Sequence, residues 1–223
     1  MDASTRVVLD KMKVAFPQGP PTAEQVRGQE FAWGRSQWEK RWPAGMYRPA
    51  ALDSQEAVAV SRRDVHRRAE RVDTEADALE LYLLMAAWGT GTKARAIARA
   101  ARPLQEEGVA ATLLQAHSAA RSEEPADCYA QMLRGGSLRI KHLGPAFFTK
   151  WIYFAGFEAG SSGRARPLIL DARVARTLGW ATWGWSASSY ARYIAVSEAL
   201  RDAWCPEAPT DVIEYALFTA NGA

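Results

Sequence analysis

The feature that most constrains the fold is the near absence of strand-like patterning. No window that could be read as a strand is longer than the five residues PLILD at 167–171. Apolar residues at helical spacing, interrupted by Gly and Pro, make up most of the remaining chain. With 223 residues, of which 48% are hydrophobic, the chain can bury a substantial core. The sequence therefore predicts an all-α protein, built as one ordinary domain or as a compact pair of helical lobes.

The composition argues against several classes of protein. The stretch MDASTRVVLDKMKVAF lacks the apolar region of a signal peptide, and no apolar run approaches the roughly 18 residues of a membrane span. Cys128 and Cys205 are too few for an iron–sulfur cluster and have no zinc-type spacing. We therefore expect a cytoplasmic protein with no membrane contact, no iron–sulfur cluster and no zinc.

Several helix boundaries follow from capping residues and breakers. A polar, Arg-rich helix is predicted over residues 54–73, and Thr74 with Asp77 forms a capping box for the next helix, which reaches Trp88. The glycines of the sequence GTG at 89–91 end that helix, and another begins directly after them. Asp211, with Glu214 three residues later, is predicted to cap the last helix.

Basic residues and turn signals concentrate between Leu138 and Leu178. The turn Leu143–Gly144–Pro145 opens a helix: glycine permits a positive φ or close backbone approach, and proline suits the first helical position. A helix N-terminus of this kind can bind phosphate. From Arg134 to Arg176, eight basic residues accompany two acids, giving a net charge of +6. This charge fits a polyanion partner, but acids opposite in space could equally balance it.

Asp171 follows the apolar run PLIL directly and precedes a predicted helix. A carboxylate in that position can act both as an N-cap and as a partly desolvated anion. The acid is thus a candidate for catalysis as well as for a capping role alone.

The order of hairpin, helix, ILD and helix resembles the helix-hairpin-helix (HhH-GPD) DNA glycosylase superfamily, and most closely its bacterial 8-oxoguanine DNA glycosylase-like members. The stretch ALELYLLMAAWGTGTKARAIARAARPL and the closing helix DVIEYALFTA extend the resemblance over residues 74–223. Residues 1–73 are left as an N-terminal helical extension or lobe of unplaced family. The resemblance implies two helical lobes with a cleft for double-stranded DNA, a monomer, and a location at the nucleoid.

The resemblance also implies an enzyme that flips a damaged base out of DNA and cleaves its N-glycosidic bond. Asp171 would stabilise the cation that develops at the sugar C1′. Lys150 could form a Schiff base with C1′ and so permit strand cleavage, or it could bind a phosphate in a monofunctional enzyme. The family places its lysine where this chain has Ala146, and Lys150 lies one helical turn later.

The remaining site residues carried over by the resemblance fall into three groups. The expected DNA contacts are Arg139, Lys141, His142, Leu143, Gly144, Pro145 and Arg173. The expected wedge and base pocket consist of Trp88, Gly89, Thr90, Gly91 and Thr92, with Trp33 and Trp151 as further stacking candidates that could instead be core. No cofactor is required, although the backbone carbonyls of Leu143 and Gly144 could hold a monovalent cation.

Several functions stay open at this stage. An oxidised purine is the default substrate, and a bulky or hypermodified base, such as those of viral genomes, is the alternative. A catalytically silent hairpin module that only binds DNA is a second alternative, and a helical interaction protein that binds a partner through its Trp clusters is a third.

Overall fold

The computed structural model describes residues 2–53, 59–159 and 163–220. Over these ranges the fold is mostly helical, as predicted, with one two-stranded antiparallel sheet that the sequence did not predict. The elements in chain order are α1 (Ala3–Ala15), α2 (Ala23–Arg27), β1 (Glu30–Ala32), α3 (Arg35–Glu39), η1 (Ala50–Leu52), β2 (Ala59–Ser61), α4 (Arg62–Ala69), α5 (Glu75–Thr90), α6 (Ala94–Ala100), η2 (Arg102–Gln105), α7 (Val109–Ser122), α8 (Pro125–Met132), α9 (Pro145–Gly156), α10 (Ala172–Thr177), α11 (Ala187–Trp204) and α12 (Asp211–Ala220).

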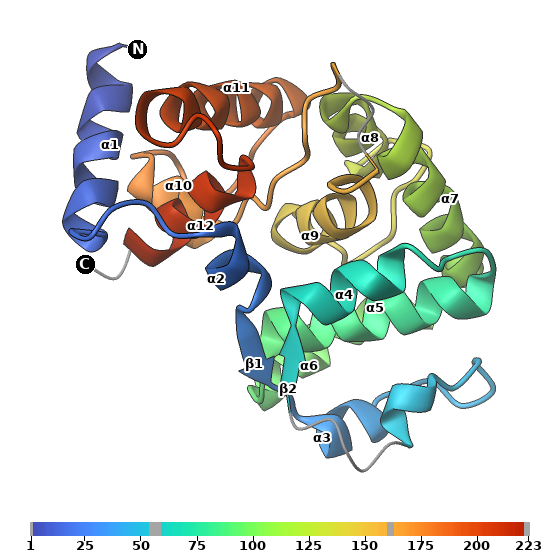
Figure 1. The fold of residues 1–223 in the computed structure, drawn as a ribbon. Coiled ribbons are helices and arrows are strands. Elements are labelled where there is room, and N and C mark those ends of the chain that lie inside the picture. The colour runs from blue at the N-terminus through green and yellow to red at the C-terminus, as the bar shows by residue number, and fades with distance from the viewer. Residues whose placement is uncertain (1, 54–58, 160–162, 221–223) are drawn as a thin grey trace.

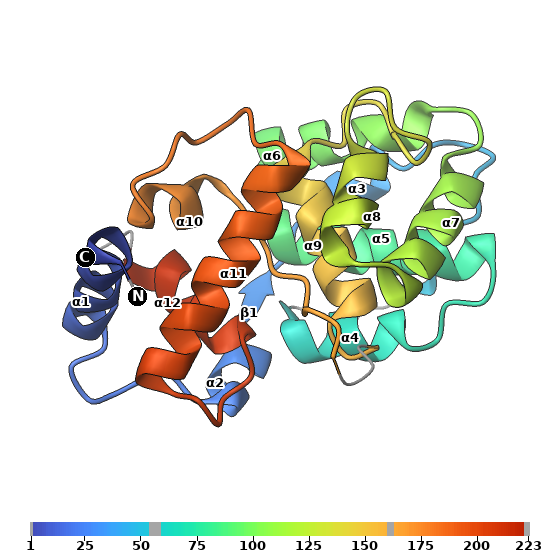
Figure 2. The ribbon, with the colours of Figure 1, turned by 90° about the horizontal axis from the view of Figure 1, so that it is seen from above.

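The helices gather into two groups. Figures 1 and 2 show α1, α10, α11 and α12 packed together at one end of the molecule and α4 to α9 at the other. The strands β1 and β2 and helix α2 lie between the groups, so the N-terminal third of the chain contacts both. In the part of the chain that the structure describes, no helix has the length and apolarity needed to cross a bilayer.

Helix α9 is the centre of the second group. Every residue from Phe148 to Gly156 is buried, Lys150 included, because α9 packs against α4, α5, α7 and α8. A helix that is buried on all sides is apolar on all sides. At Gly156 a Cβ would lie 2.2 Å from the carbonyl oxygen of Ala120, so only glycine lets α7 approach this closely. The position of Lys150 is therefore fixed by the core.

The predicted helix over residues 54–73 is partly wrong. Residues 54–58 lie outside the described ranges, 59–61 form β2, and the helix begins only at Arg62. The strand pairs Phe31 with Val60, and Ser61 then caps α4 by accepting the amide of Asp64 at 3.2 Å. The β-branched valine and the cap together explain why this stretch is extended before it turns helical.

Two other helix ends also differ from the prediction. The capping box of Thr74 and Asp77 is confirmed at the start of α5, but α5 continues through Gly89 to Thr90. Asp211 is the first residue of α12 and not its cap, because its carboxylate accepts the hydroxyl of Tyr153 at 2.9 Å. The last helix is thus held by a tertiary contact with α9.

Candidate functional site

A cavity of about 520 Å³ lies where β1, α5, α9, α10 and α12 converge. Its walls bring together residues from both ends of the chain and include two amines, two acids and three aromatic rings. The lining residues are Phe31, Ala32, Trp88, Gly89, Thr90, Gly91, Thr92, Lys93, Lys150, Ile169, Asp171, Arg173, Glu214 and Phe218. A cavity of this size that combines apolar walls with a few polar groups is typical of a small-molecule or base pocket.

Lys150 and Asp171 lie beside each other in the wall of this cavity. The Lys150 Nζ is 3.8 Å from the Asp171 Oδ2, and the two side chains are 8% and 17% exposed. The same Nζ donates a hydrogen bond to the carbonyl oxygen of Ala146 at 2.7 Å. The amine is therefore directed back along α9 by one helical turn, toward the position where the family resemblance places its lysine.

Asp171 is the N-cap of α10, as predicted. Its Oδ1 accepts the amides of Arg173 at 2.9 Å and Val174 at 3.1 Å. One carboxylate oxygen is thus bound to the helix, while the other is directed toward Lys150. A capped carboxylate cannot rotate freely, so its negative charge is held at the edge of the cavity.

Burial lowers the pKa of Lys150 below its ordinary value. The negative charges of Asp171 and Glu214 oppose this shift, and the positive charge of Arg62 adds to it. A lowered pKa increases the fraction of neutral amine, which is the nucleophilic form.

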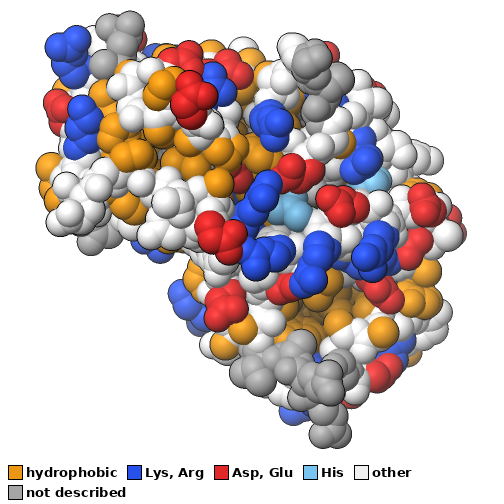
Figure 3. All heavy atoms as spheres, in the orientation of Figure 1, with side chains coloured by type: hydrophobic (Ala, Val, Ile, Leu, Met, Phe, Trp, Pro, Cys, Tyr) orange, Lys and Arg blue, Asp and Glu red, His pale blue; other side chains and the backbone are white. Residues whose placement is uncertain are grey.

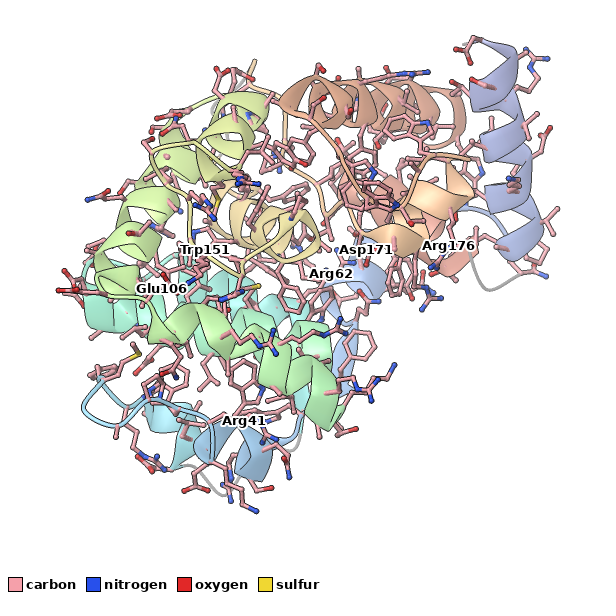
Figure 4. The ribbon with its side chains drawn as sticks, turned by 180° about the vertical axis from the view of Figure 1, so that it is seen from behind. Arg41, Arg62, Glu106, Trp151, Asp171 and Arg176 are labelled. Atoms are coloured by element: carbon pink, nitrogen blue, oxygen red, sulfur yellow. The ribbon has the colours of Figure 1, made fainter. Side chains whose placement is uncertain are left out.

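A buried ion pair lies next to this site. Arg62, which belongs to the segment predicted as a polar, Arg-rich helix, is 1% exposed, and its Nη1 lies 2.7 Å from the Glu214 Oε2. Arg62 also donates to the side chains of Gln29 at 2.7 Å and Tyr153 at 3.2 Å. Figure 4 shows Arg62 and Asp171 in the same central region of the molecule. The polar pattern of this segment does not reveal that Arg62 is buried against Glu214, which lies far away in the sequence.

Glu214 lines the cavity from α12 and was missed as a site residue. Burial raises its pKa, while Arg62 opposes that shift. Its neighbour one turn later, Phe218, also lines the cavity, and the Arg173 guanidinium lies 4.1 Å from the centre of the Phe218 ring. The spacing of four residues, which puts both side chains on one face of a helix, was the signal available in the sequence.

Trp88, which was predicted as a pocket residue, lines the cavity with its aromatic ring. Its Nε1 donates to the carbonyl oxygen of Gln29 at 3.1 Å, and its ring meets Phe31 edge to face at 5.6 Å between centroids. Phe31 is a second aromatic residue that sequence reasoning missed, and it is 36% exposed. Trp33 and Trp151 do not line the cavity and belong to the core alone.

The segment 89–92 borders the same cavity, but half of it is helical. Gly89 and Thr90 form the last turn of α5, and Gly91 leaves the helix with a φ of +56°. A Cβ on Gly89 would lie 3.3 Å from the Cδ and 3.4 Å from the Cε of Lys150. Because Gly89 has no side chain, the Lys150 side chain can pass close to the backbone of α5 at this position.

The turn before α9 has the predicted proline but uses its glycine differently. Gly144 caps α9 with a φ of −85°, and the left-handed residue is His142, at +67°. A Cβ on Gly144 would meet nothing within 4 Å, so neither backbone conformation nor packing within the chain requires glycine. Glycine here leaves open space in front of the helix start, where a phosphate could approach closely.

The predicted DNA contacts of this turn separate into buried and exposed residues. Leu143 is 6% exposed, so its side chain anchors the turn and only its backbone can meet DNA. Arg139, His142 and Gly144 are exposed, Pro145 is half-buried, and Lys141 is exposed with its Nζ 3.6 Å from the Glu106 carboxylate.

The basic surface is smaller than the sequence count implied. Arg164 donates to the carbonyl oxygens of Glu123, Ala120 and Gly156, and Arg166 lies over the ring of Phe157. Figure 3 shows the face over α4, where Lys and Arg side chains are interleaved with Asp and Glu. Arg63 of α4 forms an ion pair with Glu24 of α2. Charge is balanced there, so that face is not an open polyanion site.

The carbonyl of Gly144 does not suit the predicted cation site. Its oxygen accepts the amides of Phe147 and Phe148 at 2.9 Å each, as an N-cap carbonyl does. A cation at the Leu143 carbonyl stays a prediction. Among the described residues, no group of three or more His, Cys, Asp or Glu side chains is placed to hold a metal ion.

Comparison with known families adds one finding. The family model described as "Putative 8-oxoguanine DNA glycosylase OGG-like protein" matches residues 24–218. The matched range contains every residue that lines the cavity and most of the N-terminal part that sequence reasoning left unplaced. No curated protein and no solved structure is similar enough to this chain to count as a match.

Proposed function

The chain belongs to the OGG-like family of 8-oxoguanine DNA glycosylase-like proteins, and we propose that it excises an oxidised purine from double-stranded DNA. The observation that carries the proposal is the pairing of the buried Lys150 amine with the capped Asp171 carboxylate at one cavity. A nucleophile beside a fixed negative charge is what cleavage of an N-glycosidic bond requires, because positive charge develops at C1′. Family membership supports the DNA substrate, and the pair supports the chemistry.

In the proposed reaction the flipped nucleotide places its base in the cavity and its C1′ at the mouth. Asp171 stabilises the positive charge at C1′ while the neutral Lys150 Nζ attacks that carbon. The bond between C1′ and the base nitrogen breaks, and its electron pair leaves with the base, which takes up a proton. The amine, now bonded to C1′, loses a proton. The C1′–O4′ bond then breaks, O4′ keeps its electron pair and takes up a proton, and the nitrogen lone pair forms the C1′=N bond of a protonated Schiff base, which permits strand cleavage.

A phosphate-binding role for Lys150 suits its surroundings less well. The amine is 7% exposed and bonded within α9, whereas phosphate contacts come from side chains that reach the surface. Its position one helical turn after Ala146 is compensated by the direction of the side chain, which returns the Nζ to the Ala146 carbonyl at 2.7 Å. We therefore assign Lys150 as the nucleophile.

The cavity lining supports a guanine-type base as the substrate. Trp88, Phe31 and Phe218 supply aromatic faces for stacking, and the buried Glu214 supplies a carboxylate that accepts N–H donors. An oxidised guanine presents several such donors along its edges. The positive charge of Arg62 lies beside Glu214, so the carboxylate can stay ionised without contact with water.

The duplex would be held by the turn before α9 and by the elements around Asp171. The exposed Arg139 and His142 flank the open space at Gly144, and Arg173 stands at the mouth of the cavity. We assign the turn and its two helices as the helix-hairpin-helix element, with the cavity between the two helix groups as the cleft. The loop 91–93 at the end of α5 would enter the space vacated by the flipped base.

The deciding experiment is a screen of free-base release from duplexes with oxidised, alkylated, deaminated or hypermodified bases. We expect release of 8-oxoguanine by the wild type and none by Asp171→Asn, with duplex binding retained. Borohydride should trap a covalent complex with wild type and none with Lys150→Ala. DNA binding without release of any base would establish the silent module instead, and release of a bulky base alone would overturn the substrate.

A further inference from the structure

The loop between α10 and α11 presents a tryptophan that the proposed chemistry does not use. Trp183 is 81% exposed, whereas Trp185, two residues later, is 8% exposed. A single exposed apolar side chain is ordinary, but Trp183 lines one surface hollow together with Trp180, Trp185 and Arg192, so the aromatic surface here is a cluster beside a cation. The indole combines a large apolar face with one hydrogen-bond donor, a combination enriched at contact surfaces.

The loop is held in place at both ends. The amide of Trp180 donates to the carbonyl oxygen of Ala175 on α10 at 2.8 Å, and the Trp185 Nε1 donates to that of Ala181 at 2.7 Å. Tyr129 of α8 donates to the carbonyl oxygen of Trp185 at 2.9 Å. Trp183 is therefore displayed from an anchored loop, beside a hollow of about 260 Å³ that Arg192 also lines.

The loop lies on the same face as the proposed DNA contacts. Figure 2 shows it along the same edge of the molecule as α6 and the loops between α8 and α9, and Figure 4 looks onto that face, with Asp171 labelled in it. Contacts agree with the pictures: the Tyr129 ring meets Phe148 at 4.8 Å, and Phe148 lines the hollow beneath His142 and Gly144.

The charge around the loop favours a polyanion over a protein partner. Residues 172–197 contain three arginines, Arg173, Arg176 and Arg192, and no Asp or Glu, and an acid that interacts electrostatically with Arg192 is Asp2, the N-cap of α1. The guanidinium of Arg192 lies 5.3 Å from the centre of the Trp180 ring, at the base of the loop. An aromatic ring beside a cation is the arrangement by which proteins grip the sugar, base and phosphate of a nucleic acid strand.

We propose that the loop 179–186 is a second DNA contact, in which Trp183 packs against the duplex beside the lesion and Arg192 binds a phosphate. This inference rests on the proposed DNA-binding function and assigns it a surface outside the hairpin and the cavity. Contacts at this loop and at the turn before α9 would hold the DNA on both sides of Asp171.

The first test uses acrylamide quenching of tryptophan fluorescence, since the other eight tryptophans are buried or half-buried. Saturating undamaged duplex should shield the accessible fluorescence of the wild type. The variant Trp183→Phe should have lost that accessible component before DNA is added. An accessible component that stays unshielded at saturating duplex would overturn the proposal.

The second test measures affinity for undamaged duplex. We expect Trp183→Ala to weaken binding about tenfold, within the range found for aromatic residues that stack on nucleic acid. Arg192→Ala should lower the slope of log affinity against log salt by about one. The matched control is Val14→Ala on α1, which removes a side chain that is 75% exposed, and its affinity should equal that of the wild type.

The outcomes separate this proposal from the proposed function. Wild-type binding and base release with unaltered affinity in Trp183→Ala would overturn the loop contact alone. Binding without base release would overturn the glycosylase assignment and leave the loop testable on undamaged DNA. A change in self-association with no change in DNA affinity would assign Trp183 to a protein interface and overturn the DNA contact.

Discussion

Two ion pairs lie at the cavity and differ in exposure, distance and further partners: Lys150 with Asp171 in its wall, and Glu214 of the wall with Arg62 behind it. Arg62 and Glu214 are 2.7 Å apart, each with 1% of the side chain exposed, and Arg62 has further hydrogen-bond partners. Lys150 and Asp171 are 3.8 Å apart and more exposed, and one oxygen of Asp171 is committed to a helix cap. In the first pair, the closed pair, only Glu214 lines the cavity, whereas in the second, the open pair, both the amine and the carboxylate line it.

The two ion pairs explain how one cavity can have a rigid wall and a reactive amine. The Arg62 guanidinium keeps its charge and donates to Gln29 and Tyr153 while it pairs with Glu214, so the first pair links α12 to other parts of the fold. A buried ammonium gains less from a partner at longer distance and is easier to deprotonate. The reactive amine is therefore that of Lys150, because its partner offsets the cost of burial less than Glu214 does for Arg62.

The largest expected effect follows from removing the charge of the open pair. Asp171→Asn should reduce single-turnover base release by about 10²–10³-fold, the usual cost of losing one electrostatic group aimed at a transition state. Asparagine caps a helix as well as aspartate does, so the melting temperature should change little. Equal base release by the variant would mean that Asp171 is only a cap.

Breaking the closed pair should affect stability more than chemistry. Arg62→Met leaves Glu214 buried without its partner and should lower the free energy of unfolding by about 3–5 kcal/mol in urea titrations. The double variant with Glu214→Leu removes both charges and should recover part of that loss. A single variant as stable as wild type would show that Glu214 has another partner or is neutral.

Replacing Lys150 of the open pair should abolish the chemistry and increase stability. Lys150→Met removes an amine whose charged form burial disfavours, so we expect a gain of about 0.5–2 kcal/mol in unfolding free energy together with complete loss of borohydride trapping. Such a gain is typical where a site carries strain for its function. A loss of stability would contradict the contrast between the two pairs.

The pH dependence sharpens the same contrast. Only the neutral amine attacks C1′, so trapping on abasic-site DNA should increase with pH through the pKa of Lys150, which burial lowers. The charge of Asp171 favours the ammonium form. Asp171→Asn should therefore move the rising limb of the trapping profile to lower pH, and a shift to higher pH would contradict the assignment.

The smallest effect is expected at Gly89. Alanine suits a helix better by about 0.5–1 kcal/mol, so Gly89→Ala should be as stable as wild type or more stable. Its Cβ would press on the Lys150 side chain at 3.3 Å, and displaced reacting groups lose rate. We expect a modest decrease in the trapping rate, less than about tenfold, without a decrease in the unfolding midpoint.

Local signals predicted much of this arrangement, and long-range contacts escaped prediction. The cap at Asp171 and the capping box at Thr74 depend on neighbours within three residues, so the sequence alone contains them. Arg62 meets Tyr153 91 positions later, and no local pattern reveals that pairing. The same holds for the sheet, where Phe31 pairs with Val60.

Which aromatic and acidic residues line the cavity also could not be predicted from sequence patterns. Tryptophan is common both in cores and at contact surfaces, so Trp33 and Trp151 could not be separated from Trp88 by residue type. Glu214 and Phe218 were predicted as part of a closing helix but not as cavity lining, because the face of α12 that meets the cavity is set by Arg62 and Tyr153.

The cavity wall joins β1, near the start of the described chain, to α12 at its end. During synthesis, at about 5–20 residues per second, β1 leaves the ribosome well before Glu214 and Phe218 exist. Until α12 docks, Arg62 has no carboxylate to hold and the cavity lacks one side. The cavity is therefore completed only after α12 has been synthesised and has docked against the rest of the fold.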